Sequence, residues 1–477
     1  MYIYRGEEIK RIDRTAADHG LETFTLMENA GRALFEAIVK NVSKSQRILI
    51  LAGKGNNGGD GVVLARYLKQ HGFICELAIP LGEPVSETAE RHYRYYLHCG
   101  FEVSEISEDY DVLIDALLGV GARLPLCNDI EKLIDWMNEQ EAVRMAIDIP
   151  TGVLADTGEV EKAIKADRTF TFHGYKPSAF LEGSVEYYGQ TEVLDIGLPQ
   201  TSNWRVWTKG DVAASFPKRN SASHKGTFGT GLLIAGTDEM PGSAMLASLA
   251  AMRSGIGKLT VATTRFASAI IASRVPECTF SHDGLEKVAA GAVPKGIRGV
   301  AIGPGLDNEE KIDRALHEVM KRDLPIIIDA GALKKRDYPM REAMTIVTPH
   351  PGEFSKMTGL PTKEIQKDRL RLASEYAISN KVTVVLKGRN TVMAFPDGDV
   401  WVNSTGNDGL AKGGTGDTLT GMILAFISFY EDKKAAVANA VYCHGVSAEQ
   451  WSETRAKSSL LASDVSENLA YVLKEFE

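Results

Sequence analysis

Residues 47–61 read RILILAGKGNNGGDG, an apolar run that leads directly into a turn containing five glycines. A helical pattern follows over Val62–His71. Glycines let the backbone come close to a ligand, and the start of a helix attracts phosphate. A strand that passes through such a turn into a helix is typical of a βαβ unit. It predicts a parallel sheet that binds its ligand at the carboxyl ends of the strands.

The same alternation of short apolar runs and helical stretches continues on both sides of this segment. Runs of this length between helices predict parallel strands. The strand-like runs are 47–52, 73–80, 111–118 and 144–149 in the first half, and 231–235, 258–263, 299–302, 325–329 and 383–386 in the second. A predicted helix over 128–140 lies between two of them.

A poorly periodic stretch, 200–223, separates the two halves and contains two tryptophans, a proline and a basic pair. We therefore place a domain boundary near Gly210. The expected fold is α/β, with two three-layer domains over residues 1–210 and 211–477, the first a Rossmann-like open sheet. A chain of 477 residues is also too long for one hydrophobic core.

Composition narrows the classes of function. A formal charge of −9 and a pI near 5.7 give no reason to expect nucleic-acid binding. No apolar stretch approaches the ~20 residues that span a bilayer, and residues 1–13 are too charged for a secretory signal. The five cysteines are scattered without CxxC spacing, which is typical of a reducing compartment. We expect a cytoplasmic protein.

The glycine-rich turn carries more polar groups than a plain connection needs. Asn56, Asn57 and Asp60 lie among its glycines. The turn lacks the GxxxxGK[ST] pattern of a P-loop and the GxGxxG pattern of dinucleotide-binding folds. The alternative is a mobile strand–helix turn without a ligand, and the polar residues speak against it.

Two further predicted strands end in carboxylates, Asp115 in IDALLG and Asp148 in IDIPTG. The carboxyl ends of parallel strands meet at one edge of a sheet. Asn57, Asp115 and Thr151 would supply hard oxygen ligands that suit an alkali or alkaline-earth cation. Asp148 remains as a candidate general acid or base. Each aspartate alone could be only a helix cap.

These segments resemble the NAD(P)H-hydrate epimerase family. The resemblance covers residues 1–200 and includes 28–31 (ENAG), the GKGNNGGDG turn, 115–119 (DALLG), 148–152 (DIPTG), 176–177 and 195–199. It implies that Asn57, Asp115 and Thr151 hold a potassium ion. Thr151 stands where the family usually has serine, and Val120 where a small hydroxyl residue is usual. The substrate contacts that the resemblance implies are Asn56, Asn57, Gly58, Gly59, Asp60, Gly119, Val120, Gly121, Ala122, Arg123, Leu124, Pro125 and Asp148.

A second glycine-rich segment lies in the C-terminal half, where NSTGNDG (403–409) is followed by GGTGDTLTG (413–421). Glycines before a helix expose backbone N–H groups that can cradle an anion, and the helix dipole adds to the attraction. Asp417 would lie beside that anion, where it could manage the proton of a substrate hydroxyl. The alternative is a capped helix after a flexible loop.

Other polar segments of this half also follow strand-like runs. They are 241–244 (PGSA), 302–306 (IGPGL), 348–353 (TPHPGE) and 387–391 (KGRNT). His350 lies between two prolines in a rigid turn, which favours a ligand role over a place in the core.

Together these segments resemble the ADP-dependent NAD(P)H-hydrate dehydratases, which have a ribokinase-like fold. The resemblance covers residues 216–477. It implies that the hydrated cofactor contacts Ala244, Gly305, His350 and Asp417. The adenine nucleotide would be bound by Lys387, Gly388, Arg389, Asn390, Thr391, Gly413, Gly414, Thr415 and Gly416.

Three residues of the C-terminal half depart from the family's pattern. Gly331 replaces a usual aspartate and so removes a carboxylate that could help to place magnesium. Asp408 replaces a proline and Lys412 a small residue, which adds opposite charges near the phosphate loop.

The two resemblances imply a repair enzyme for hydrated NADH and NADPH. The first half would interconvert the R and S epimers with K⁺, through Asp148. The second would dehydrate the S epimer with ADP and Mg²⁺, through Asp417, and release AMP and phosphate. We expect a homo-oligomer without nucleic-acid or membrane partners. The alternative is a ribokinase-like small-molecule kinase with an N-terminal ligand-binding module.

Overall fold

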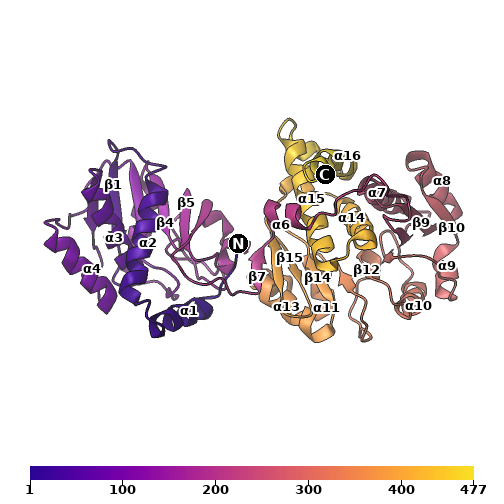
Figure 1. Ribbon diagram of the computed structural model, residues 1–477, viewed down its shortest axis with the longest axis horizontal. Coiled ribbons are helices and arrows are strands. Elements are labelled where there is room, and N and C mark those ends of the chain that lie inside the picture. The colour runs from indigo at the N-terminus through magenta and orange to yellow at the C-terminus, as the bar shows by residue number, and fades with distance from the viewer. The chain divides into compact units, whose positions relative to one another are not determined.

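The computed structural model describes residues 1–477 and divides into two compact units (Figure 1). The first comprises Met1–Trp204 with Gln366–Asp368, and the second Arg205–Ile365 with Arg369–Glu477. Both units consist of a sheet with helices packed against it, so the predicted α/β class is confirmed.

The first unit contains a six-stranded sheet in the order β2-β1-β3-β4-β5-β6, in which all neighbours run parallel. Its strands are β1 (Arg47–Ala52), β2 (Ile74–Ala78), β3 (Val112–Ala116), β4 (Val143–Ile147), β5 (Arg168–Phe172) and β6 (Gln190–Leu194). The register pairs Leu51 with Asp115 and Asp115 with Ala146, so the carboxyl ends of β1, β3 and β4 meet at one edge.

The helices of the first unit cover both faces of this sheet because the residues of β1 alternate between them. Ile48 and Ile50 belong to a core with α2 and α3, whereas Leu49 and Leu51 belong to a core with α5. The helices are α1 (Gly6–Asp18), α2 (Thr23–Ile38), α3 (Asn56–Gln70), α4 (Glu87–His98) and α5 (Asn128–Glu139), with short 3₁₀ turns η1 (Pro177–Phe180) and η2 (Val185–Tyr187).

The second unit is built on a ten-stranded sheet in the order β10-β9-β8-β11-β12-β13-β14-β15-β16-β7. The pairs from β10 to β14 are parallel, and β15 pairs antiparallel with β14 and β16. The strands are β7 (Trp204–Val206), β8 (Thr230–Ile234), β9 (Lys258–Thr263), β10 (Thr279–His282), β11 (Gly299–Ile302), β12 (Ile326–Ile328), β13 (Thr345–Val347), β14 (Thr383–Leu386), β15 (Thr391–Ala394) and β16 (Val400–Asn403).

The core of the second unit lies where α7 and α14 pack together. A Cβ on Gly421 of α14 would lie 2.1 Å from the carbonyl oxygen of Ala247 on α7, so glycine allows the two helices to approach. The helices are α6 (Lys209–Ser215), α7 (Pro241–Arg253), α8 (Arg265–Arg274), α9 (Gly284–Ala289), α10 (Glu309–Met320), α11 (Pro351–Thr358), α12 (Thr362–Lys367), α13 (Arg369–Asn380), α14 (Thr415–Phe429), α15 (Lys433–Ser452) and α16 (Ala462–Lys474), with 3₁₀ turns η3 (Ala330–Ala332), η4 (Asp408–Leu410) and η5 (Lys457–Ser459).

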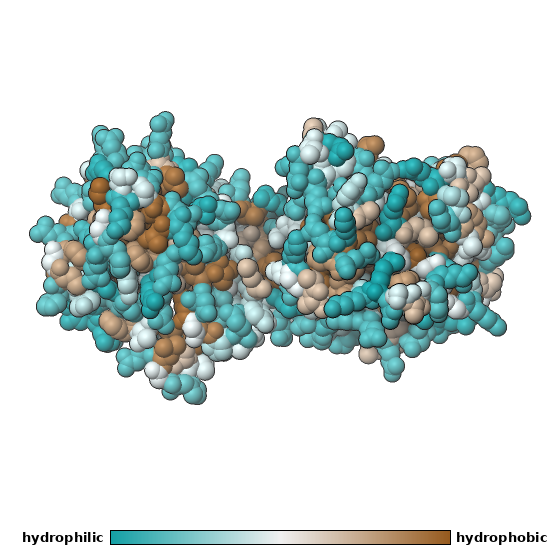
Figure 2. All heavy atoms as spheres, turned by 45° about the horizontal axis from the view of Figure 1, so that its top comes forward, coloured by the Kyte–Doolittle hydropathy of each residue, from teal (hydrophilic) through white to brown (hydrophobic).

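The face drawn in Figure 2 is mostly hydrophilic, with scattered hydrophobic residues. None of the helices combines the length and hydropathy that crossing a membrane requires. All five cysteines are free thiols.

Candidate active sites

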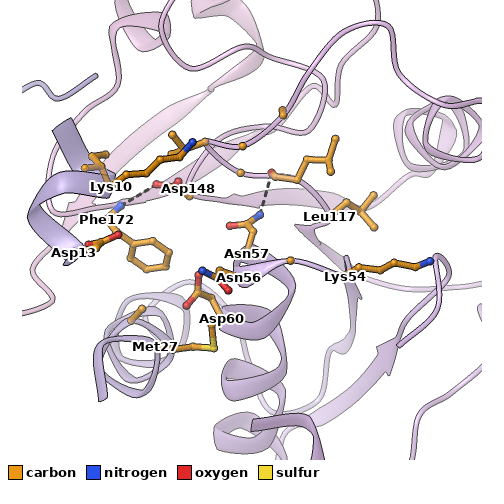
Figure 3. A pocket seen from close by; sticks show the side chains of 18 of the residues that line it. Lys10, Asp13, Met27, Lys54, Asn56, Asn57, Asp60, Leu117, Asp148 and Phe172 are labelled. Atoms are coloured by element: carbon orange, nitrogen blue, oxygen red, sulfur yellow. Dashed lines mark hydrogen bonds between the residues drawn. The ribbon is translucent and has the colours of Figure 1, made fainter. Parts of the chain in front are cut away.

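The first unit has a cavity of about 770 Å³ at the carboxyl ends of β1, β3 and β4 (Figure 3). Residues of α1 and α2 also line it. Its polar lining includes Lys10, Asp13, Lys54, Asn56, Asn57, Asp60, Asp148, His173 and Lys176. The strand ends that the sequence pointed to therefore share one cavity, as parallel topology requires.

The helix that follows the first glycine-rich segment begins earlier than the sequence pattern predicts. The α3 helix already begins at Asn56, so the prediction of a turn over 53–61 was wrong in its extent. A Cβ on Gly53 would lie 2.0 Å from the carbonyl oxygen of Leu117, and one on Gly58 would lie 1.8 Å from that of Gly53. These glycines bring the first turn of α3 against the end of β3.

The early start of α3 decides which residues of this segment line the cavity. Asn56, Asn57 and Asp60 line the cavity, whereas Gly58 and Gly59 are buried and do not. A Cβ on Gly59 would lie 2.5 Å from the sulfur of Met27, so its role in the structure is close packing on α2. In the next loop, Gly119, Val120, Gly121 and Ala122 line the cavity, and Arg123, Leu124 and Pro125 do not.

The three residues expected at a cation meet around the end of β3. Asp115 is fully buried and accepts hydrogen bonds from the N–H and Oγ1 of Thr151, both at 2.7 Å, and from the N–H of Leu117 at 3.1 Å. Asn57 donates to the Leu118 carbonyl at 3.0 Å. Burial raises the pKa of Asp115 to about 6. A buried carboxylate beside amide, hydroxyl and carbonyl oxygens fits a hard cation such as K⁺.

Asp148 lies where β4 ends and has a left-handed backbone conformation (φ 66°), which is unusual for a residue with a side chain. Its Oδ1 accepts hydrogen bonds from Thr171 Oγ1 at 3.1 Å, from the Phe172 N–H at 3.3 Å and from Lys176 Nζ. Lys176 is 1% exposed and also donates to Thr171 Oγ1 at 2.8 Å. Strained backbone at a cavity wall is typical of functional sites.

Two more carboxyls face the same cavity. Burial raises the pKa of Asp13 to about 6, with Lys176 lowering it and Asp148 raising it further. Burial also raises the pKa of Asp60 well above its usual value, with added repulsion from Asp148 and Asp13. Asp60 is a site residue that the sequence predicts, whereas Asp13 and Lys176 are site residues that it does not predict. No local pattern separates Asp13 from the other charged residues of α1.

In the second unit the GTGD segment forms the N-terminus of α14, as the motif predicts. Gly414 has a φ of 90°, and a Cβ on Gly416 would lie 3.2 Å from Lys387 Nζ. Burial and the nearby Asp329 raise the pKa of Asp417 to about 6, while a hydrogen bond with Ser243 lowers it. Lys387, Gly416 and Asp417 thus lie together at one helix start.

A buried charge network supports this helix start. Asp329 is 1% exposed, and it accepts hydrogen bonds from Thr348 Oγ1 at 2.7 Å, Lys387 Nζ at 3.0 Å and Thr420 Oγ1 at 2.7 Å. Burial lowers the pKa of Lys387, but Asp329 and Glu353 outweigh it and leave that pKa raised. The sequence predicts only a strand over 325–329 and does not identify Asp329 as the centre of this network.

Three other expected cofactor contacts have different environments. His350 caps α11: its Nδ1 accepts from the N–H of Gly352 at 3.0 Å, and its side chain is 58% exposed. Gly305 (φ 64°) packs against Ser243 at the start of α7, where Ala244 is buried. The structure therefore groups Ala244 and Gly305 with Asp417 through Ser243, whereas the His350 ring lies at the exposed start of α11 with its Nε2 3.6 Å from Glu353 Oε1.

The backbone of the 387–391 segment is held by hydrogen bonds from Arg369, a residue that the sequence does not point to. Arg369 is 1% exposed and donates to the carbonyls of Leu386 at 2.7 Å, Lys387 at 3.0 Å and Arg389 at 2.9 Å. A Cβ on Gly388 (φ 144°) would lie 2.9 Å from the same guanidinium. The buried cation therefore sets the path of the predicted nucleotide-binding segment.

The structure also shows what surrounds Gly331, Asp408 and Lys412, the three residues that depart from the family's pattern. A Cβ on Gly331 would lie 1.8 Å from the Leu306 carbonyl, so this backbone path leaves no room for the aspartate that it replaces. Asp408 forms an ion pair with Lys457 at 3.3 Å, and Lys412 donates to the Ser458 carbonyl at 2.8 Å. The side chains of Asp408 and Lys412 therefore both contact residues of η5.

Comparison with known proteins covers both units. Residues 231–470 match the family described as NAD(P)H-hydrate dehydratase, and residues 23–178 match the family described as YjeF-related protein N-terminus. The ADP-dependent (S)-NAD(P)H-hydrate dehydratase of Bacillus subtilis is 52% identical over 275 residues, which is 58% of this chain and 100% of that protein. Matches in both halves do not favour the alternative of a small-molecule kinase with a binding module.

Solved structures agree with the ribokinase-like fold of the second unit. The ADP/ATP-dependent NAD(P)H-hydrate dehydratase from Bacillus subtilis, co-crystallised with ATP/Mg²⁺, has a TM-score of 0.57 and 51% identity and covers 57% of this chain and 99% of that chain. A ribokinase-like superfamily protein from Enterococcus faecalis has a TM-score of 0.52 at 26% identity, with 58% and 98% coverage.

One relative matches along the whole length. The bifunctional NAD(P)H-hydrate repair enzyme Nnr of Moorella thermoacetica is 32% identical over 520 residues, which is 100% of this chain and 97% of that protein. The order of the two sites in the structure is the order of the two family matches. The chain therefore belongs to the family of bifunctional NAD(P)H-hydrate repair enzymes.

Proposed function

We propose that the chain repairs hydrated NADH and NADPH through two reactions, one in each half. Water added across the 5,6 double bond of reduced nicotinamide destroys the hydride donor and gives two epimers at the hydroxylated carbon. Residues 1–210 interconvert the R and S epimers, and residues 211–477 dehydrate the S epimer with ADP, releasing AMP and phosphate. The observation that carries this proposal is a glycine-lined, carboxylate-bearing site in each unit of a chain that matches bifunctional enzymes along its whole length.

In the epimerase half, the hydrated nicotinamide lies beside Asp148, whose carboxylate is within reach of the ring hydroxyl. Loss of that hydroxyl gives a ring iminium, which water can re-enter from either face. Lys176, buried against Asp148, holds the carboxylate in place. Asn56, Asn57, Asp60 and the 119–122 loop line the same cavity and are placed to bind the nucleotide.

Asn57, Asp115 and Thr151 are the residues that would hold a potassium ion in this half. The ion would neutralise the buried Asp115 carboxylate, which has only hydrogen-bond donors from Thr151 and Leu117 around it. These residues also join the start of α3 to the loop after β3 through Leu118. Filling the site would therefore fix two segments of the cavity wall.

In the dehydratase half, Asp417 takes the proton of the substrate hydroxyl as that oxygen attacks the terminal phosphate of ADP. Backbone N–H groups of Gly413–Gly416 and the Lys387 ammonium stabilise the phosphoryl group in transit. The phosphorylated hydroxyl then leaves as phosphate, and the neighbouring ring carbon loses a proton to water, which restores the ring double bond. Lys387–Thr391 would bind the nucleotide, and Mg²⁺ would screen its phosphates when bound.

The test separates the two halves with one substitution in each. Asp148→Asn is expected to lower epimerisation by about 10²–10⁴-fold and to leave dehydration of the S epimer unchanged, and Asp417→Asn to do the converse. Absorbance of reduced nicotinamide, followed with pure S epimer and with the epimer mixture, measures both reactions. Loss of both activities in Asp148→Asn would contradict the assignment of separate roles.

We also propose a cytoplasmic homo-oligomer. The five free thiols suit a reducing compartment. Phe266, Leu461 and Tyr471 are large hydrophobic side chains that are 56%, 54% and 69% exposed in the single chain, as interface residues can be before assembly. Light scattering of the purified chain gives the mass that decides the oligomeric state.

A further inference from the structure

The epimerase cavity holds more acid–base groups than a single-aspartate reaction uses. Asp13, Asp60 and Asp148 lie toward one end of the cavity, and Lys54 lies at the other (Figure 3). Asp148 follows β4, Asp60 lies on α3 and Asp13 lies on α1, so the three carboxyls come from different walls. Their convergence is a property of the fold, since α1 and β4 are far apart in the sequence.

Asp148 and Asp13 differ in the hydrogen bonds that they receive, and this difference suits them to different proton transfers. Asp148 receives an ammonium, a hydroxyl and an amide N–H, all on Oδ1. The three donors hold the carboxylate through Oδ1 and leave Oδ2 without a hydrogen bond from the chain, so Oδ2 can accept a proton from water. Asp13 receives no hydrogen bond from the chain, and burial together with the charge of Asp148 raises its pKa to about 6. A carboxyl in that setting can hold and release a proton near neutral pH.

Epimerisation requires both functions within one turnover. The hydroxyl must gain a proton to leave as water, and the entering water must lose one. The geometry points to Asp13 as the proton donor of epimerisation, paired with Asp148 as the proton acceptor on a separate wall of the cavity. This inference rests on the proposed epimerase function of the first unit and names a second group for it.

The step balances without any further reactant. The Asp13 carboxyl gives its proton to the ring hydroxyl, the carbon–oxygen bond breaks, and its electron pair leaves with the water. The ring nitrogen supplies an electron pair to form the iminium. A water molecule then adds to that carbon from the other face and gives a proton to Asp148. The proton returns to Asp13 through water or Asp60, whose pKa responds to both aspartates.

Further charged and titratable groups line the cavity around Asp13. Of these, Lys176 favours the ionised form of Asp13, and Asp148 opposes it. The remaining lining groups are Lys10 on α1, Lys54, Asp60, Cys127, Asp129 and His173.

The experiment compares Asp13→Asn with Asp18→Asn in the full-length chain. Asp18 is on the same helix but exposed, so it controls for loss of charge on α1. Interconversion of separated R and S epimers, corrected for the uncatalysed rate, is expected to fall by about 10²-fold or more in kcat for Asp13→Asn, with KM nearly unchanged. Asp18→Asn is expected to match the wild type.

Two further readouts distinguish a proton donor from a structural residue. The wild-type rate is expected to fall as pH rises above about 6, because the donor loses its proton, and Asp13→Asn is expected to lose this dependence. Asp13→Glu is expected to recover at least tenfold over Asp13→Asn. An Asp13→Asn enzyme near the wild-type rate, or an Asp13→Glu enzyme no better than Asp13→Asn, would overturn the assignment. A wild-type chain without any epimerisation would instead overturn the proposed function.

Discussion

At the residue scale, we expect the proposed base Asp417 to set the pH dependence of dehydration. A base must be ionised to accept the hydroxyl proton, and burial raises the pKa of Asp417 to about 6. The rate of ADP-dependent recovery of reduced nicotinamide should therefore rise as pH increases through about 6 and level off above it. Asp408→Asn, at a residue whose side chain is 80% exposed, should keep the wild-type profile. A wild-type rate that is flat from pH 5 to 8 would exclude Asp417 as the base.

A second prediction at this scale concerns Asp115, the only carboxylate among the proposed potassium ligands. A ligand that binds the folded state stabilises it, so K⁺ should raise the melting temperature of the wild-type chain. Asp115→Asn removes the negative charge and should abolish that K⁺-dependent rise. Thermal unfolding in potassium chloride and in choline chloride of equal ionic strength measures the effect. An equal rise in the variant would place the ion elsewhere.

At the element scale, the start of α14 depends on the backbone conformation of its glycines. Gly414 has a φ of 90°, and a Cβ there would lie 2.5 Å from Leu246 Cδ1, whereas a Cβ on Gly413 would meet nothing within 4 Å. Gly414→Ala should cost about 1 kcal/mol or more of unfolding free energy and weaken ADP binding. Gly413→Ala should leave stability nearly unchanged. Denaturant unfolding and calorimetric ADP titration of both variants test this, and equal losses would contradict it.

At the scale of the whole molecule, each unit has its own sheet and its own hydrophobic core. The match to the Bacillus subtilis dehydratase takes up 58% of this chain and covers 100% of that protein. Fragments 1–204 and 205–477 should therefore fold separately, the first with epimerisation alone and the second with dehydration alone. Circular dichroism and the absorbance assay check this. A second fragment that folds but lacks activity would show that dehydration requires the first.

Local patterns in the sequence were enough to predict much of the fold and part of each site. The alternation of apolar runs and helical stretches predicts an α/β chain, because hydrophobic periodicity reflects burial in each element. The strand ends carrying Asp115 and Asp148 do lie at one cavity, since parallel strands place their carboxyl ends at one edge. The GTGD segment begins a helix as its glycines indicate. The binding roles of these residues remain predictions.

The sequence by itself thus determined the class of fold, the positions of the glycine-rich segments and the carboxylates that end strands, because each is encoded in neighbouring residues. The extent of the turn over 53–61 was not among them, since α3 begins at Asn56. Only the tertiary structure decided which groups meet. The Lys176–Asp148 pair, the place of Asp13, the Asp329 network and the Arg369 support all join segments that are distant in the chain. It also showed that Gly331 has no room for a side chain. Such contacts follow from strand order and packing, which local periodicity does not specify.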